Sequence, residues 1–348
     1  MSQYISYATS SLLFRQLAAA SRSNLPYGEV LQILSQDPEM FGRDTVAVQA
    51  LANQFSNGDA LSSALLKLPE LVCAETAELV KTAETQGSLA GVLDNIADDL
   101  TELEQRRTAI RQVMAWPAII LAIASILIAM MMIFVIPAFS SLFASFGADL
   151  PTPTLMIMGI SDFVVRWWWL MAALIAALVI SVRLNKLPHR IRLFAERAVL
   201  GIPLARKYLV QAFASRTVNW LKVVHHDPKL LLAALHHLRA TTSVMSFQLC
   251  LVNLESRLAG NMPLGQALTD LDPLPKRVAL LMQLGEKVKD IDGALDQIAD
   301  FSEAERLSKL AGLERWFILC IYVFLGTSVG LFVIGMYLPI FKMGQAVG

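Results

Sequence analysis

Two pairs of adjacent histidines, His225–His226 and His236–His237, are the side chains best suited to metal chemistry in this sequence. Neutral imidazole is a common metal ligand, and a zinc site needs three or four ligands. Neighbouring residues on a helix point in different directions, and no clear third ligand lies near either pair in the sequence. We therefore expect surface or core histidines, with no bound metal and no cofactor.

Motifs for nucleotide or hydrolytic chemistry are missing from the sequence. It contains no GxxxxGK[ST], no GxGxxG and no HExxH, the patterns that cradle phosphates, bind dinucleotides or hold a catalytic zinc. The three cysteines, Cys73, Cys250 and Cys320, form no CxxC pair, which argues against a disulfide framework or a zinc site. An enzymatic function is not expected, and any ATP hydrolysis would come from a partner.

An internal repeat is the most informative feature. GVLDNIAD at 91–98 matches GALDQIAD at 293–300, an offset of 202 residues. The same offset maps Pro137 onto Pro339, and a slip of one residue aligns Leu61 with Leu264. Six acidic residues occupy matched positions in the two copies: Glu84, Asp94 and Asp98 in the first, and Glu286, Asp296 and Asp300 in the second. The chain therefore contains two copies of one helical unit.

The repeated acidic positions allow two interpretations. Ser88 and Asp290 are good N-caps for the helices that follow them, and the acids could make ion pairs within their own domains. Alternatively, the six acids could form a docking face for a cytoplasmic partner. Both interpretations stay open at this stage.

Composition indicates a membrane protein. Of the 348 residues, 55% are hydrophobic and 17% are charged, and the mean hydropathy is +0.53. Soluble domains carry about 45–50% apolar and about 25% charged residues. The formal net charge is +0, so no basic surface for nucleic acid is expected.

Three uncharged stretches are long enough, alone or with their flanks, to cross a bilayer, which takes about 20 residues. They predict transmembrane helices at 113–137, 163–183 and 316–341; a buried core helix is the alternative for each. The segments 1–112 and 184–315 are then water-facing helical domains, 138–162 is an outer loop with an interfacial helix, and 342–348 is an outer tail.

Basic residues flank the inner ends of these spans. Arginines and lysines precede the first and third spans and follow the second, whereas only Lys342 follows the third. Positive residues stay on the cytoplasmic side, which predicts a cytoplasmic N-terminus and a periplasmic C-terminus. In the third span, Gly326 and Gly330 form a GxxxG pattern that permits close helix packing.

Helical periodicity dominates the water-facing segments. Leu89, Leu93, Ile96, Leu100 and Leu103 recur at spacings of four and three, which is typical of one apolar face of a helix. We expect one long helix from Leu89 into the first span. The predicted fold class is an all-α membrane protein.

The ordered set of motifs resembles the GspF/PilC family, the inner-membrane platform proteins of type II secretion and type IV pilus assembly. The resemblance runs from FRQLAAASRSNLPYGEVL, which begins at Phe14, through MAWPAII (114–120) and LGEKVKDIDGALDQIADF (284–301) to MYLPIFKMG (336–344). VVHHDPKLL (223–231) departs from the family pattern, as does Ala83 where members often carry glycine. The short N-terminus favours the type IVb-like pilus form.

The resemblance implies two homologous cytoplasmic helical bundles of about six helices each and three transmembrane helices. It also implies partners: a cytoplasmic hexameric secretion or pilus ATPase, pilin or pseudopilin subunits, other inner-membrane assembly proteins, and further copies of the chain in a homo-oligomer. The alternative function is a small membrane transporter or channel. Against it, only Asp162 and Arg166 bring ionisable groups to the edge of a span, whereas transport paths usually need polar groups inside the membrane.

Overall fold

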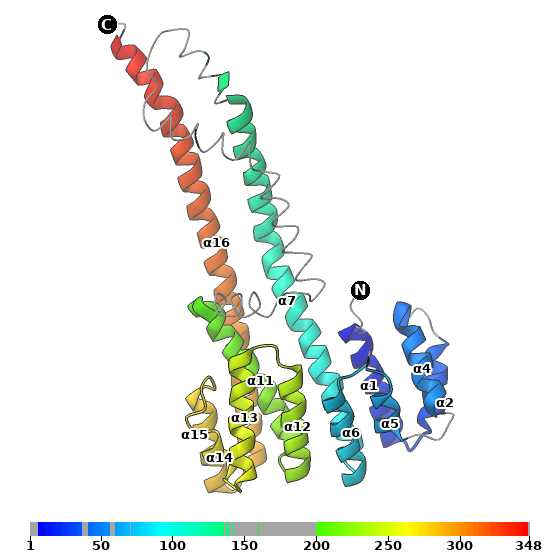
Figure 1. Cartoon of the computed structure of the whole chain (residues 1–348). Coiled ribbons are helices and arrows are strands. Elements are labelled where there is room, and N and C mark those ends of the chain that lie inside the picture. Colours follow the sequence, from blue (N-terminus) through cyan, green and yellow to red (C-terminus); the bar gives the residue numbers. More distant parts are fainter. Residues whose placement is uncertain are drawn as a thin grey trace. The chain divides into compact units, whose positions relative to one another are not determined.

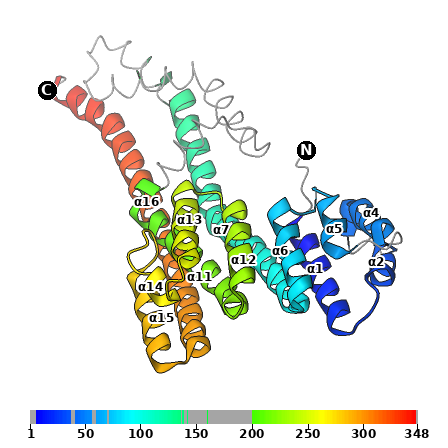
Figure 2. The ribbon, with the colours of Figure 1, turned by 60° about the horizontal axis from the view of Figure 1, so that its bottom comes forward.

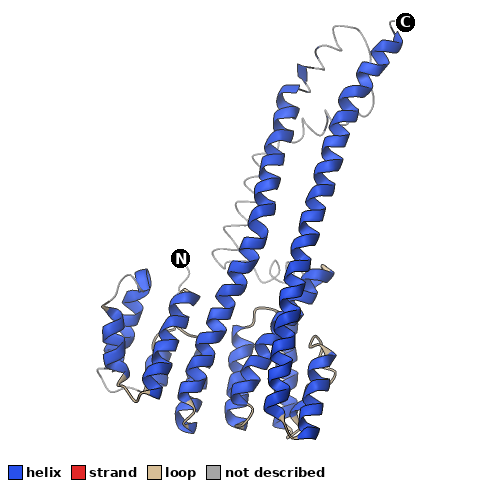
Figure 3. Cartoon of the chain, turned by 180° about the vertical axis from the view of Figure 1, so that it is seen from behind, coloured by secondary structure: helices blue, strands red, loops and turns tan. Residues whose placement is uncertain are grey.

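The computed structural model describes residues 6–36, 41–55, 60–69, 71–135, 137–138, 141, 159 and 200–346. Every regular element in these ranges is helical (Figure 3). The chain divides into two compact units. One unit comprises Met1–Thr108 and Leu193–Leu310, and the other comprises Ala109–Arg192 and Ala311–Gly348. The predicted all-α class is confirmed for the described residues.

The first repeat is a series of short helices followed by a long one (Figure 1). They are α1 (Tyr7–Arg22), α2 (Tyr27–Ser35), the 3₁₀ turn η1 (Gly42–Asp44), α4 (Thr45–Phe55), α5 (Leu61–Leu66), α6 (Ala74–Gln86) and α7 (Leu89–Met130). Gly87 ends α6 in the left-handed conformation with φ 72°, which glycine adopts without steric penalty.

The second repeat is a similar series of helices that also ends in a long one, without a counterpart of η1 in the described residues. They are α11 (Pro203–Val224), α12 (Pro228–Thr241), α13 (Met245–Ala259), α14 (Leu264–Ala267), α15 (Lys276–Val288) and α16 (Ile291–Ala346). The helices α6 and α15, and likewise α7 and α16, begin 202 residues apart, at Ala74 and Lys276 and at Leu89 and Ile291. The repeat read from the sequence is therefore a repeat of structure, and the long helix begins at Leu89 as predicted.

The start of α12 shows how the sequence sets a helix end. Asp227 accepts hydrogen bonds from the backbone N–H groups of Lys229 at 2.9 Å and Leu230 at 3.4 Å. Pro228 occupies the first turn, where its missing N–H costs nothing and its fixed φ suits the helix. The HHDPKLL segment, which departs from the family pattern, is thus a capped helix start.

The two repeats share one hydrophobic core. Buried residues of α1 to α7, such as Phe14 and Leu93, belong to the same continuous cluster as Trp220 and Leu235 of the second repeat. Helix α6 of the first repeat packs against α12 of the second (Figures 1 and 2). Burial of this common apolar surface holds the repeats together as one body.

Two described helices are long and apolar enough to cross a membrane, by length and composition. They are Leu89–Met130 and Ile291–Leu331. In their most apolar windows only 12% and 6% of residues are buried, whereas a core helix of a soluble protein would be mostly covered. These helices contain most of the predicted spans 113–137 and 316–341.

The ends of these helices differ from the predicted boundaries. Helix α7 runs through Pro117 and continues as a π-helical turn, η2 (Met131–Val135). Helix α16 continues to Ala346, into the segment predicted as the tail 342–348. The predicted span 163–183 and nearly all of the loop 138–162 lie outside the described residues.

Candidate functional site

The two glutamates predicted for docking are used inside the fold. Glu84 accepts hydrogen bonds from the backbone N–H of Ser62 at 3.2 Å and from its hydroxyl at 2.6 Å. Glu286 accepts from the backbone N–H of Gly265 at 2.8 Å. Ser62 and Gly265 lie in the first turns of α5 and α14, where backbone N–H groups have no helical partner. Each glutamate therefore caps a short helix of its own repeat.

Gly265 permits the shorter of the two backbone N–H contacts with a glutamate. A Cβ at this position would lie 2.6 Å from Glu286 Oε2 and 2.9 Å from the backbone of Gln283. In the first repeat the equivalent residue is Ser62, whose hydroxyl itself donates to Glu84. The same capping contact is thus made twice with different side chains.

The predicted aspartates lie nearer the surface and mostly form ion pairs. Asp94 pairs with Arg22 and Asp98 with Arg15, each at 2.7 Å. In the second repeat Asp296 pairs with Lys222 at 2.6 Å. Asp300 is exposed. Exposed pairs of this kind contribute about 0–1 kcal/mol, so these carboxylates remain available to a partner.

Only one of the two predicted N-caps is made. Asp290 Oδ1 accepts from the backbone N–H of Gly293 at 2.9 Å, in the first turn of α16. The hydroxyl of Ser88 is buried and has no hydrogen-bond partner among the described residues. The N-cap prediction is therefore confirmed for Asp290 and wrong for Ser88.

A buried ion pair joins the two repeats. Asp99 of α7 accepts two hydrogen bonds from Arg216 of α11, both at 2.6 Å. The side chains are 6% and 7% exposed. Arg216 also donates to the hydroxyl of Thr241 at 2.8 Å. This bidentate geometry is the one that a planar guanidinium and a carboxylate favour, and it fixes the register of α7 against α11.

His237 of α12 extends this pair toward α6. Its Nε2 lies 3.8 Å from Asp99 Oδ2, and its Nδ1 lies 2.9 Å from the hydroxyl of Thr76. The ring packs against Trp220 with centroids 4.9 Å apart. The sequence interpretation of His237 as a core histidine is thus confirmed.

The electrostatics of the cluster follow from burial and neighbours. Burial alone would raise the pKa of the Asp99 carboxyl, but the Arg216 guanidinium and His237 hold that pKa well below its usual range. Burial also acts to lower the pKa of His237, but the neighbouring Asp99 and Cys73 outweigh it and the pKa lies above its usual value. We call Asp99, Arg216 and His237 the inter-repeat charge cluster.

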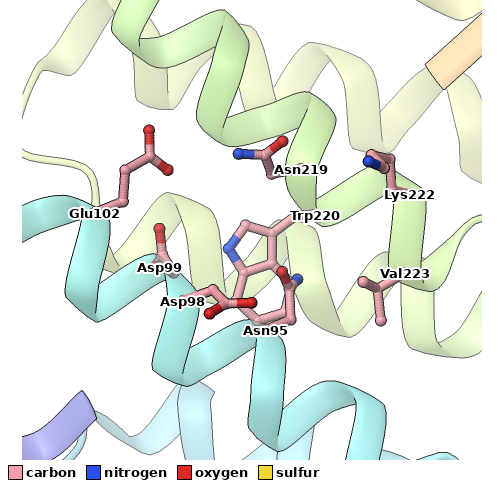
Figure 4. Close-up of a pocket in the computed structure, with 8 residues that line it drawn as sticks. All are labelled: Asn95, Asp98, Asp99, Glu102, Asn219, Trp220, Lys222 and Val223. Atoms are coloured by element: carbon pink, nitrogen blue, oxygen red, sulfur yellow. The ribbon is translucent and has the colours of Figure 1, made fainter. Parts of the chain in front are cut away.

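A polar cleft of about 310 Å³ lies beside this cluster, between α7 and α11 (Figure 4). Asp98, Asp99 and Glu102 line one side, and Asn219 and Lys222 the other. Two buried donors there, Asn95 Nδ2 and Trp220 Nε1, have no partner among the described residues. The cleft has the size and the free hydrogen-bonding groups to hold ordered water.

The acid response of the fold should depend on Asp99. Its folded-state pKa lies below that of the unfolded chain, so its contribution to stability is present above about pH 4 and is lost as the pH falls further. We expect the full chain in detergent to lose stability as the pH falls below about 4, measured by chemical unfolding at a series of pH values. A variant with Asp99→Asn and Arg216→Met should lose less over this range. If the wild type and the double variant lost the same stability at low pH, this role of Asp99 in the acid response would be contradicted.

The remaining predicted positions are surface features in the described residues. His236 pairs with Glu255 at 2.7 Å. At Gly326 and Gly330 an added Cβ would meet nothing within 4 Å, so the described chain leaves this stripe of α16 open. The structure brings a third possible ligand to one histidine pair that the sequence did not indicate, because Asp292 of α16 lies next to both His225 and His226.

Comparison with known proteins identifies the family. Residues 13–137 and 231–339 match the family described as type II secretion system (T2SS), protein F. The chain is 28% identical to the type IV pilus assembly protein TapC of Aeromonas hydrophila, over 97% of this chain and 82% of that protein. It is 25% identical to the type IV pilus assembly protein PilC of Pseudomonas aeruginosa, over 97% and 90%.

A secretion protein is also among the relatives. The type II secretion system protein F of Vibrio cholerae is 25% identical over 83% of this chain and 71% of its own length. The family match falls on both repeats and covers more than half of the residues. The chain therefore belongs to the type II secretion system protein F family.

Proposed function

We propose that this chain is the inner-membrane platform of a type IV pilus or type II secretion machine. In this role it is a scaffold, not an enzyme, and couples a cytoplasmic hexameric ATPase to the extraction of pilin or pseudopilin subunits and their addition to a filament. The family match across both repeats carries the proposal. The relatives named for pilus assembly and for secretion support both versions of the machine.

The packing of the repeats supports three membrane crossings. Asp99 and Arg216 are in direct contact, so the part of α7 before the span and helix α11 lie on the same side of the membrane. Because α7 itself crosses the membrane, the chain has to cross a second time before α11 begins. The predicted span 163–183 supplies this second crossing. Basic residues at the inner ends of the spans support a cytoplasmic position for this body and a periplasmic C-terminus.

The cytoplasmic body offers exposed carboxylates to the ATPase. Asp98 and Asp296 have side chains 63% exposed, and Asp300 is exposed as well. Asp98 and Asp300 are equivalent positions of the two repeats. Glu84 and Glu286 are poorer candidates, because each already caps a helix. Asp94 is only 25% exposed and contributes less.

Retention of the ATPase on membranes tests the coupling. We expect membranes that contain the wild-type chain to hold the assembly ATPase, and membranes without it to release it. Combined Asp98→Asn, Asp296→Asn and Asp300→Asn substitutions should weaken retention about tenfold, since surface charges of a docking face are individually modest contributors.

Glu78→Gln on α6 is the matched control, because Glu78 is an exposed acid outside this set. It should leave retention unchanged while the chain stays in the membrane at normal levels. Full retention by the triple variant would reject the acidic docking face. If membranes that lack the chain retained the ATPase equally well, the proposed coupling of this chain to the ATPase would be rejected.

The transmembrane helices are proposed to bind further copies and other assembly proteins. Small residues let helices approach closely in a bilayer, and at Gly326 and Gly330 of α16 no described residue lies within 4 Å of an added Cβ. The open stripe supports a homo-oligomer or contact with another span. Nucleic acid has no place in this proposal, because the net charge is +0.

A further inference from the structure

We propose that His225, His226 and Asp292 form a Zn²⁺ site in the second repeat. Their ligand atoms all lie within 4.8 Å of one another. His225 caps the end of α11, His226 follows it, and Asp292 lies in the first turn of α16. The inference is independent of the proposed platform function.

The hydrogen bond of His225 selects the ring nitrogen that faces Asp292. Its Nδ1 lies 3.1 Å from the backbone carbonyl oxygen of Leu221. A carbonyl oxygen can only accept, so Nδ1 carries the proton and, in the neutral ring, Nε2 carries the lone pair. A backbone carbonyl bound to the second ring nitrogen is the usual support of a metal-binding histidine.

The three groups converge on one point. His225 Nε2 lies 3.3 Å from Asp292 Oδ1, and His226 Nε2 lies 3.6 Å from the same oxygen. The two imidazole rings also lie together, with their centroids 3.7 Å apart. One divalent cation between them can accept a lone pair from each of the three ligands.

Two of the three ligand separations match a small tetrahedral ion, and the third is within 4.8 Å. Ligands about 2.0–2.1 Å from Zn²⁺ are separated by about 3.3–3.4 Å along a tetrahedral edge. The contacts of Asp292 Oδ1 with the two histidines, 3.3 and 3.6 Å, are close to this edge length. Nitrogen and carboxylate oxygen are accepted zinc ligands, and water can take the fourth position.

The site combines a fixed ligand with two accessible ones. The side chain of His225 is 6% exposed, whereas those of His226 and Asp292 are 70% and 69% exposed. A metal can therefore enter from solvent. At the offset of the repeat the first copy carries Ser23, Asn24 and Ala90, so this site belongs to the second repeat alone. Bound Zn²⁺ would join the end of α11 to the start of α16.

Binding of Zn²⁺ to the full chain tests the proposal. The chain is purified in detergent with any affinity tag removed, and Zn²⁺ is titrated in competition with a chromophoric chelator. We expect saturable binding of one ion per chain. Asp292→Asn and His226→Ala should each weaken binding by at least about 100-fold, since even outer-shell partners are worth 10–100-fold.

His236→Ala is the control, because His236 is a partly exposed histidine that pairs with Glu255 on other helices. It should leave the affinity unchanged. Both site variants change exposed side chains, so they preserve the fold, and Co²⁺ as a spectroscopic probe should lose its tetrahedral visible bands in both. Absence of saturable Zn²⁺ binding by the wild type would overturn the site. Equal weakening by His236→Ala would overturn it too.

Discussion

Replacing Asp99 with asparagine is expected to destabilise the body formed by the two repeats by about 3–5 kcal/mol. The substitution leaves the buried Arg216 guanidinium without its carboxylate, and the Arg216 side chain is only 7% exposed. A buried charge that loses its partner carries a large desolvation cost. Chemical unfolding of the full chain in detergent, followed by far-UV circular dichroism, measures the change.

The neighbouring residue supplies a matched control. Asp98→Asn removes a carboxylate one position away, whose pair with Arg15 has side chains 63% and 50% exposed, and should cost about 0–1 kcal/mol. The double substitution Asp99→Asn with Arg216→Met should recover most of the loss, because replacing both partners of a buried pair is often neutral. A cost for Asp99→Asn no larger than that for Asp98→Asn would contradict the importance of this pair.

Trp220→Ala should destabilise the same body by about 3–5 kcal/mol. Trp220 is 1% exposed and belongs to the core shared by both repeats. Its removal would open a large cavity beside His237, against whose ring it packs. The unfolding midpoint of the full chain, compared with wild type at constant pH, gives the size of the effect.

Trp220→Phe separates packing from hydrogen bonding. The indole N–H has no partner among the described residues, so phenylalanine breaks no hydrogen bond to them and keeps most of the aromatic packing. We expect a cost below about 1.5 kcal/mol. If alanine were tolerated as well as phenylalanine, Trp220 could not be a principal support of the packing between repeats.

Much of the fold could be predicted from the sequence because it depends on local patterns. Leu89 begins α7 as its periodicity predicts, and the 202-residue offset recurs in the starts of α7 and α16. Gly87 marks a helix end through its backbone freedom. These features depend on residues within a few turns of each other, so they can be read from one stretch of sequence.

The packing of one repeat on the other could not be predicted in this way. It depends on contacts between residues more than a hundred positions apart, such as Asp99 with Arg216. One signal was present: Asp99 follows Val92 and Ile96 at helical spacing, on a face where both are buried. An acid on such a face requires a buried partner, but periodicity alone cannot say which residue supplies it.

The acidic docking prediction shows the same limit. Matched positions in the repeat identified Glu84 and Glu286 as a pair, and the structure confirms that they act alike. Their shared role is to cap α5 and α14. The sequence interpretation had kept ion pairs within each domain as the alternative to docking, and it did not predict these caps. The third ligand beside His225 and His226 was missed because Asp292 lies 66 positions beyond His226 in the chain.

Deletion of the gene with complementation tests the platform proposal most directly. Sheared surface filaments and secreted proteins are quantified in the same strain, under conditions that express both machines. We expect loss of one product and its recovery on complementation: loss of filaments identifies a pilus platform, and loss of secreted proteins identifies a secretion platform. Normal levels of both products in the deletion strain would contradict the platform function.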